Sequence, residues 1–92
     1  MIRGFRHKGL ERYFRRSDQS GIPVQSAARI RRVLDRLDSV TQPEQMNIPG
    51  LRFHQLKGER VGTYSVTVTG NLRITFDFDG EDAVRVNLED YH

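Results

Sequence analysis

The stretch TYSVTVTGNLRITFDF, residues 63–78, decides the fold, because apolar and polar side chains alternate along both of its halves. This period of two is typical of strands that bury one face. A two-residue turn between the halves would place their apolar rows on opposite faces of the hairpin. A three-residue loop, residues 69–71, instead pairs Val66 with Ile74. We therefore expect an antiparallel hairpin with this odd loop.

The flanking sequence supplies the rest of the sheet. Residues 51–54 alternate in the same way, so we expect His54 to share with Arg73 the face that points away from the core. A final strand is indicated by three alternating apolar residues, Val84, Val86 and Leu88. The face that carries His54 is expected to remain open as a concave polar surface.

The first half of the chain changes to the helical period. Residues 2–6 are expected to form a short strand, and apolar residues at i, i+3 and i+4 predict a short amphipathic helix over residues 8–16. A longer helix is predicted after Pro23. Its buried stripe consists of five residues, Ala27, Ile30, Val33, Leu34 and Leu37.

The overall prediction is a single domain, residues 1–92, of the α+β class. Capping-box spacing from Thr41 to Glu44 predicts one more helical turn before the sheet begins. We expect a small antiparallel-rich sheet with two N-terminal helices packed on one face.

Composition excludes several classes of site. The chain has no cysteine, which excludes disulfides, a thiol nucleophile and cysteine-ligated zinc. No uncharged stretch approaches the roughly 20 residues that span a bilayer, and the start lacks the apolar run of a signal peptide. We therefore expect a cytoplasmic protein without a membrane partner.

Positive charge is concentrated toward the N-terminus. Residues 1–60 hold 13 Lys and Arg against 6 Asp and Glu, whereas residues 61–92 hold 2 against 6. Such clusters suit a polyanion such as RNA. A solvated helix face is the alternative interpretation, and RNA is favoured because the chain also offers the chemistry to cut it.

The candidate chemistry is that of a metal-free ribonuclease, and no metal or cofactor is predicted. RNA supplies its own nucleophile, the 2′-OH, so two imidazoles, His54 and His92, suffice as base and acid. Lys57 and Arg73 are expected to hold the developing phosphorane charge. Two neighbours complete the set, Tyr91 to stack a base or donate a hydrogen bond and Asp90 to orient an imidazole.

Other polar residues are expected to have structural roles. His7 is predicted to be a surface or capping residue, and residues 79–82 to be a polar hairpin turn and not a cation site. If the last strand simply continued, Tyr91 would face one way and Asp90 and His92 the other. We therefore expect the chain to bend near Glu89, so that the side chains of Asp90, Tyr91 and His92 converge.

Several motifs in order resemble the HigB-type toxins of the RelE/ParE superfamily. They are residues 1–10, RFHQLKGER at 52–60, residues 64–66, residues 71–76 and EDYH at 89–92. The resemblance implies a RelE-like, microbial-ribonuclease-type fold and cleavage of mRNA in the ribosomal A site. It also implies contact with the ribosome and its rRNA, a HigA-type helix-turn-helix antitoxin, and operator DNA bound only through that antitoxin.

Carried over residue by residue, the resemblance gives the same candidates. The catalytic set falls on four residues, His54, Asp90, Tyr91 and His92. The family's supporting basic residues fall on Lys57 and Arg73. Three further basic residues, Arg60, Arg6 and Lys8, complete the expected substrate-binding set. Two positions depart from the pattern: Glu59 stands where many relatives have Asp, and Leu72 where they usually have Trp. Leu72 is expected in the core, so the departure reduces the core and leaves the site unaltered.

Two rival functions stay open at this point. A gyrase-poisoning toxin of the ParE kind has the same fold, and the paired histidines argue against it because gyrase poisoning needs no acid and base. A non-catalytic RNA-binding module would need only the basic clusters. DNA-damage signalling would indicate the gyrase-poisoning toxin. Full toxicity of both His54→Ala and His92→Ala would indicate the non-catalytic RNA-binding module.

Overall fold

The computed structural model describes residues 1–90. Its helices and strands are α1 (Lys8–Arg16), α2 (Ala27–Ser39), β1 (His54–Gln55), β2 (Thr63–Thr67), β3 (Leu72–Asp79) and β4 (Asp82–Asp90). Three single turns of 3-10 helix lie between them, at Val24–Ser26, Pro43–Met46 and Gly58–Arg60. None of the helices in this part of the chain is long and apolar enough to cross a membrane.

The four strands form one antiparallel sheet in the order β1-β2-β3-β4. Val66 pairs with Ile74, and the backbone N–H of Val68 donates to the carbonyl oxygen of Leu72 at 2.8 Å. The predicted three-residue loop is therefore confirmed, and both apolar rows of the hairpin point into one core.

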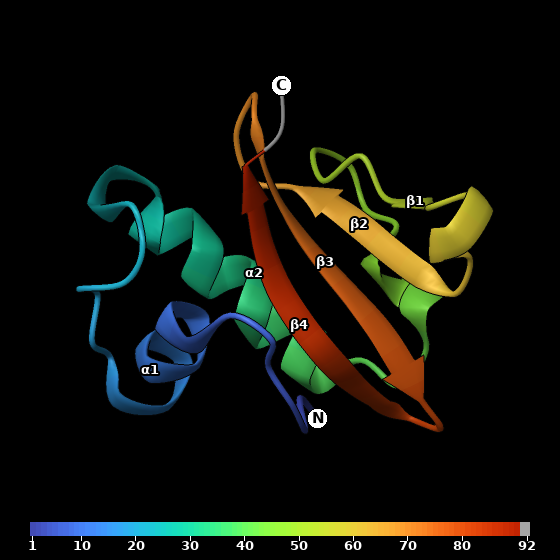
Figure 1. The fold of residues 1–92 in the computed structure, drawn as a ribbon, viewed down its shortest axis with the longest axis horizontal. Coiled ribbons are helices and arrows are strands. Elements are labelled where there is room, and N and C mark those ends of the chain that lie inside the picture. The colour runs from blue at the N-terminus through green and yellow to red at the C-terminus, as the bar shows by residue number, and fades with distance from the viewer. Residues whose placement is uncertain (91–92) are drawn as a thin grey trace.

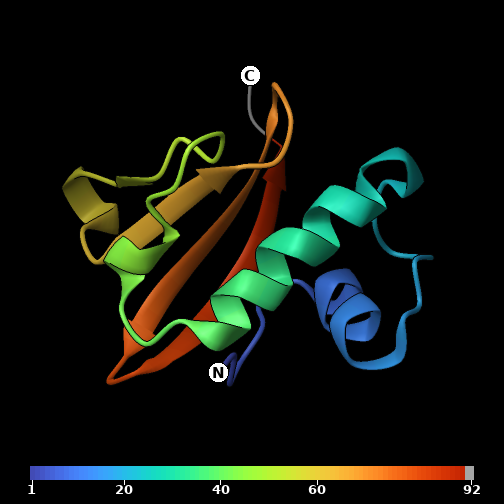
Figure 2. The same ribbon diagram turned by 180° about the vertical axis from the view of Figure 1, so that it is seen from behind.

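The helices lie on one side of the sheet, which confirms the predicted α+β class. Figure 2 shows α2 running across the strands, with α1 beside α2 toward the β4 edge. Side chains from both helices and from the sheet form one buried cluster, which includes Leu10, Ile30 and Phe76. The opposite side of the sheet faces the viewer in Figure 1 and carries no helix.

The predicted strand over residues 2–6 is present only as two isolated bridges to β4. Ile2 bridges Ala83 and Phe5 bridges Val86, both in parallel orientation. The backbone N–H of Arg3 donates to the carbonyl oxygen of Ala83 at 2.8 Å, whereas the N–H of Ile2 points away from β4 and donates to the side chain of Asp38 at 2.8 Å. The segment still covers the outer edge of β4.

One residue interrupts the regular period of β4. Asp77 pairs with Val84 but Thr75 pairs with Asn87, so β4 carries one extra residue here, and Arg85 within it has a φ of 52°. This is a β-bulge. Val84 lies in the predicted strand and is buried, but it shares the face of Asp77 and lies outside the core cluster.

The extra helical turn after α2 is confirmed, but its cap differs from the predicted one. Gln45 closes the turn, since its side-chain Oε1 accepts from the backbone N–H of Thr41 at 2.7 Å and of Gln42 at 3.0 Å. Glu44 was expected in that role. A Gln one position later reaches back equally well, so the motif is shifted by one residue.

Candidate functional site

One row of polar side chains crosses the open face from the edge strand. The pairing of neighbouring strands gives its members as His54, Ser65, Thr75 and Asn87. Residues that pair across strands point to the same face. Strand spacing places His54 about 10 Å from Thr75. The prediction that His54 lies on the open face is thereby confirmed.

His54 is exposed and its ring is oriented by the backbone. Its Nδ1 lies 3.0 Å from the carbonyl oxygen of Arg52. Because a carbonyl only accepts, this hydrogen bond requires the tautomer with the proton on Nδ1. The lone pair is then on Nε2, where it can accept a proton from a substrate.

Glu89 is the centre of a charged network in the next row. It pairs with Arg73 across β3 and β4. Oε1 accepts from Arg60 Nη1 at 3.1 Å and from Arg73 Nη2 at 3.0 Å. Oε2 accepts from Arg60 Nη2 at 2.5 Å and from Thr75 Oγ1 at 2.8 Å. The carboxylate thus uses about all four of its lone-pair positions.

This network shifts the titration of its members. Hydrogen bonding from Arg60, and then from Thr75 and Arg73, lowers the pKa of Glu89 to about 2 against the opposing effect of burial. The same contact raises the pKa of Arg60. Glu89 is therefore ionised at neutral pH and fixes two guanidinium groups on the open face.

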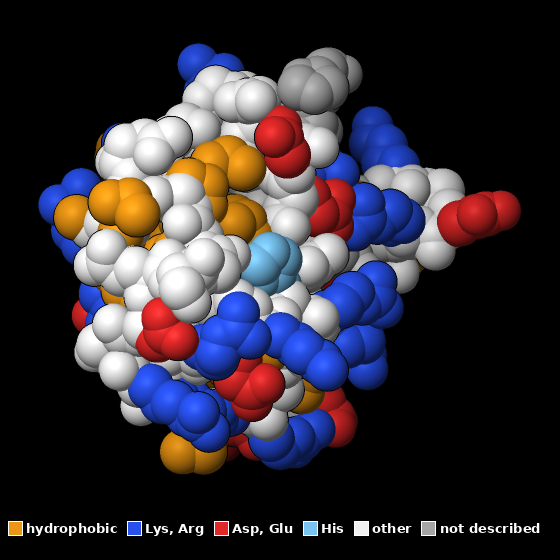
Figure 3. All heavy atoms as spheres, turned by 60° about the vertical axis from the view of Figure 1, so that its left-hand side comes forward, with side chains coloured by type: hydrophobic (Ala, Val, Ile, Leu, Met, Phe, Trp, Pro, Cys, Tyr) orange, Lys and Arg blue, Asp and Glu red, His pale blue; other side chains and the backbone are white. Residues whose placement is uncertain are grey.

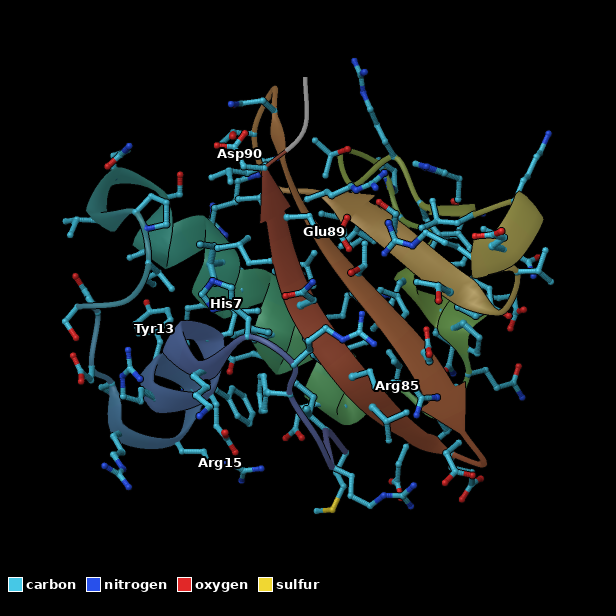
Figure 4. The ribbon with its side chains drawn as sticks, viewed as in Figure 1. His7, Tyr13, Arg15, Arg85, Glu89 and Asp90 are labelled. Atoms are coloured by element: carbon cyan, nitrogen blue, oxygen red, sulfur yellow. The ribbon has the colours of Figure 1, made fainter. Side chains whose placement is uncertain are left out.

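Sequence reasoning missed the role of Glu89 and of Thr75. Both were visible only as members of alternating strands, and Glu89 was read as the start of the terminal motif. The sequence feature that could have indicated Glu89 is Arg73, because a charged residue on the open face needs a carboxylate when it is largely buried. Figure 4 shows Glu89 near the C-terminal end of β4, with Arg85 toward its other end.

The five predicted substrate-binding residues are not gathered at one point. Arg6 and Arg60 line the same small hollow on the open face, together with Thr75. Lys57 is exposed, directly after β1. Lys8 begins α1 and lines a separate hollow with Arg12, Arg15 and Arg16. Lys and Arg side chains gather over the lower half of the face shown in Figure 3, with Asp and Glu side chains between them.

The C-terminal candidates are placed only as far as Asp90. β4 continues to Asp90 in register with Leu72, so the expected bend near Glu89 is not present in the described chain. Asp90 therefore lies on the face opposite Glu89, where its Oδ1 accepts from Asn71 Nδ2 at 2.9 Å. The other two predicted residues, Tyr91 and His92, lie outside the described residues.

His7 is confirmed as a capping residue. It is the N-cap of α1, and its Nδ1 accepts from the backbone N–H of Leu10 at 3.1 Å. Burial, and then the nearby Arg12, lower its pKa. The residues at 79–82 form the β3–β4 turn as predicted, and within residues 1–90 no three His, Asp or Glu side chains are grouped so that they could hold a metal ion.

Comparison with known proteins identifies the family of this chain. Residues 3–92 match the family model of the HigB-like toxins, described as the RelE-like toxin of the type II toxin-antitoxin system HigB. The chain is also 44% identical over 92 residues to the protein named Endoribonuclease HigB of Proteus vulgaris, covering 100% of both chains. The chain therefore belongs to the HigB-like family of RelE-like type II toxins.

Proposed function

We propose that this toxin is an endoribonuclease that cleaves mRNA in the ribosomal A site and thereby inhibits translation. The observation that carries the proposal is the full-length similarity to Endoribonuclease HigB. The open polar face carries an exposed histidine and, in the next row, two arginines held by Glu89, which are groups suited to that chemistry.

The proposed reaction uses the 2′-OH of the RNA as the nucleophile. One imidazole, His54 or His92, removes the 2′-OH proton as the 2′ oxygen forms a bond to phosphorus. The bond from phosphorus to the 5′ oxygen then breaks, and the other imidazole donates a proton to that oxygen. Each proton transfer contributes about 10²- to 10⁴-fold to the rate. The products are a 2′,3′-cyclic phosphate and a 5′-hydroxyl.

Arg73 and Arg60 are proposed to hold the charge that develops on the phosphorane. Their guanidinium groups each present five donors, and the contacts to Glu89 use only some of them. Glu89 holds both guanidinium groups on the open face, where they can meet the phosphate. Lys57 adds a mobile cation, while Asp90 and Tyr91 are proposed to act beside His92.

Binding to an antitoxin follows from the type II family. We propose that this partner is of the HigA type, with a helix-turn-helix domain through which the complex reaches operator DNA. We also propose that the ribosome positions the mRNA, because a domain of this size has few groups to hold RNA in line for attack.

Mapping 5′ ends of cellular mRNA after brief expression tests the proposal. Wild type should produce new 5′-hydroxyl ends within coding regions, and His54→Ala and His92→Ala should not. His7→Asn is the matched control, because it removes a histidine that caps α1 and keeps a side chain suited to capping. Cleavage by both alanine variants at the wild-type level would refute the acid–base mechanism, and DNA damage without cut mRNA would refute the nuclease.

A further inference from the structure

Two hollows meet at the β1 edge of the sheet. The His54 hollow has a volume of about 680 Å³ and is lined by Arg29, Gly50, Arg52, His54 and residues 67–70. The α2 hollow has a volume of about 370 Å³ and is lined by Arg29, Arg32, Val33, Arg36 and residues 48–51. Arg29 and Gly50 line both, so the two hollows adjoin, and they are described here together as one depression.

Four arginines follow this depression and are called here the arginine track: Arg29, Arg32, Arg36 and Arg52. No Asp or Glu lines either hollow. Within the described part of the chain, none of the four is in an ion pair, whereas Arg3, Arg31 and Arg60 each contact a carboxylate. The positive charge of the track is therefore not compensated locally.

The helix and the following loop hold the track in place. Its three members on α2 stand at i, i+3 and i+7, so they share one helix face and extend over about 10 Å. Arg29 Nη2 donates to the carbonyl oxygen of Gly50 at 3.2 Å. Arg36 donates from Nε and Nη2 to the carbonyl oxygen of Gln45, at 3.1 Å and 2.7 Å. Both guanidinium groups are positioned by uncharged acceptors and retain further donors.

We propose that the arginine track binds the sugar-phosphate backbone of a single RNA strand on one side of the cleavage point. This inference rests on the proposed function and extends it beyond His54. Uncompensated arginines recognise phosphates through paired donors. The apolar floor of the α2 hollow, which includes Val33 and Leu51, is suited to an unstacked base.

An acidic protein segment is the other polyanion that such a surface could take. The position of the α2 hollow next to the His54 hollow favours RNA, because a strand bound at His54 has to leave along one of the surfaces around it. Recognition through phosphates alone would be independent of base sequence. The track is therefore expected to add affinity and register, with little sequence preference.

The test is binding of a 2′-O-methyl RNA oligonucleotide, which lacks the nucleophile and remains intact. Its affinity is measured by fluorescence anisotropy over a range of KCl concentrations. The variant is Arg32→Gln/Arg36→Gln, at the end of the track far from His54. Loss of two phosphate contacts should lower the salt slope by about 1.4 and weaken binding roughly tenfold or more at low salt.

Arg3→Gln is the matched control for charge. Arg3 is exposed and already paired with Asp79 and Asp82, so its removal should leave affinity and slope unchanged. Circular dichroism establishes whether each variant is folded. If the double variant is not folded, the single substitutions Arg32→Gln and Arg36→Gln are measured in its place. Wild-type affinity and slope in the folded variants would overturn the proposal.

A second measurement separates RNA from protein as the ligand. If the double variant binds the RNA normally but loses the antitoxin, the track belongs to the antitoxin interface and the proposal is wrong. The nuclease proposal is tested separately by cleavage, since His54→Ala should bind the uncleavable RNA and fail to cut mRNA. If wild type never cuts mRNA and the double variant still loses RNA binding as expected, only the nuclease proposal is refuted.

Discussion

Replacing Glu89 by Gln tests the network that positions the two arginines of the open face. The side chain of Glu89 is 19% exposed and that of Arg73 is 17% exposed, so the pair is largely removed from water. Gln cannot offer a second acceptor oxygen, and its NH₂ group would face the donors of Arg60. We expect Arg73 to lose its contact to the Glu89 carboxylate, which is unfavourable in a partly buried position.

The magnitude follows from the titration of Glu89. A pKa of about 2 against an ordinary value of 4.5 gives an upper bound of about 3 kcal/mol, at 1.36 kcal/mol per unit. Arg60 is 42% exposed, so solvent screening reduces its share. We expect Glu89→Gln to lower the free energy of unfolding by about 2 kcal/mol at pH 7.

The pH dependence provides the sharper check. Because the folded pKa of Glu89 lies below the unfolded one, its contribution is complete above about pH 4.5 and is lost as the pH falls toward 2. Urea unfolding of wild type and Glu89→Gln should therefore give a difference at pH 7 that falls to less than half near pH 3. Glu81→Gln, in the exposed β3–β4 turn, is the control for the same change of charge. An equal difference at both pH values would refute the electrostatic account.

Two further predictions concern the N-terminal helix. His7→Ala should lower the free energy of unfolding by about 1 kcal/mol through loss of the α1 cap. The pKa of His7 is lowered in the folded state, so the stabilisation by His7 is complete only above pH 6.5. Thermal unfolding should therefore show the difference between wild type and His7→Ala shrinking below that pH. Gly9→Ala should be destabilising by about 2 kcal/mol, since its Cβ would overlap the carbonyl group of Gly21. Gly70→Ala is the control, with no atom within 4 Å of its Cβ, and equal denaturation midpoints for the two variants would contradict the clash.

Much of the fold was predictable because local periodicity carries it. The alternation in residues 63–78 fixed the odd loop, since only that register buries both apolar rows. The stripe of α2 was predictable for the same reason, and all five of its predicted residues are buried. The two bridges of residues 2–6 to β4 were not, because they link positions far apart in the chain.

The candidate site was predictable residue by residue but not as an arrangement. His54 on the open face follows from alternation within one short segment. The network around Glu89 depends on Arg60, which comes from a loop before β2, and on Arg73, which comes from β3. A local pattern contains no information on how these three segments meet, so the sequence could place Arg73 on the open face without indicating its partner.

The bulge at Arg85 determines which residues of β4 reach the site. The β3–β4 turn pairs Asp79 with Asp82, and an uninterrupted ladder from that turn would pair Arg73 with Leu88. One extra residue in β4 shifts this pairing by one, so Arg73 instead meets Glu89 and Leu88 packs against the core. An arginine and not a glycine adopts the positive φ at position 85. The irregularity therefore has no glycine to mark it in the sequence. The charged network of the open face therefore exists because of a local departure from the period of two that otherwise predicts this sheet.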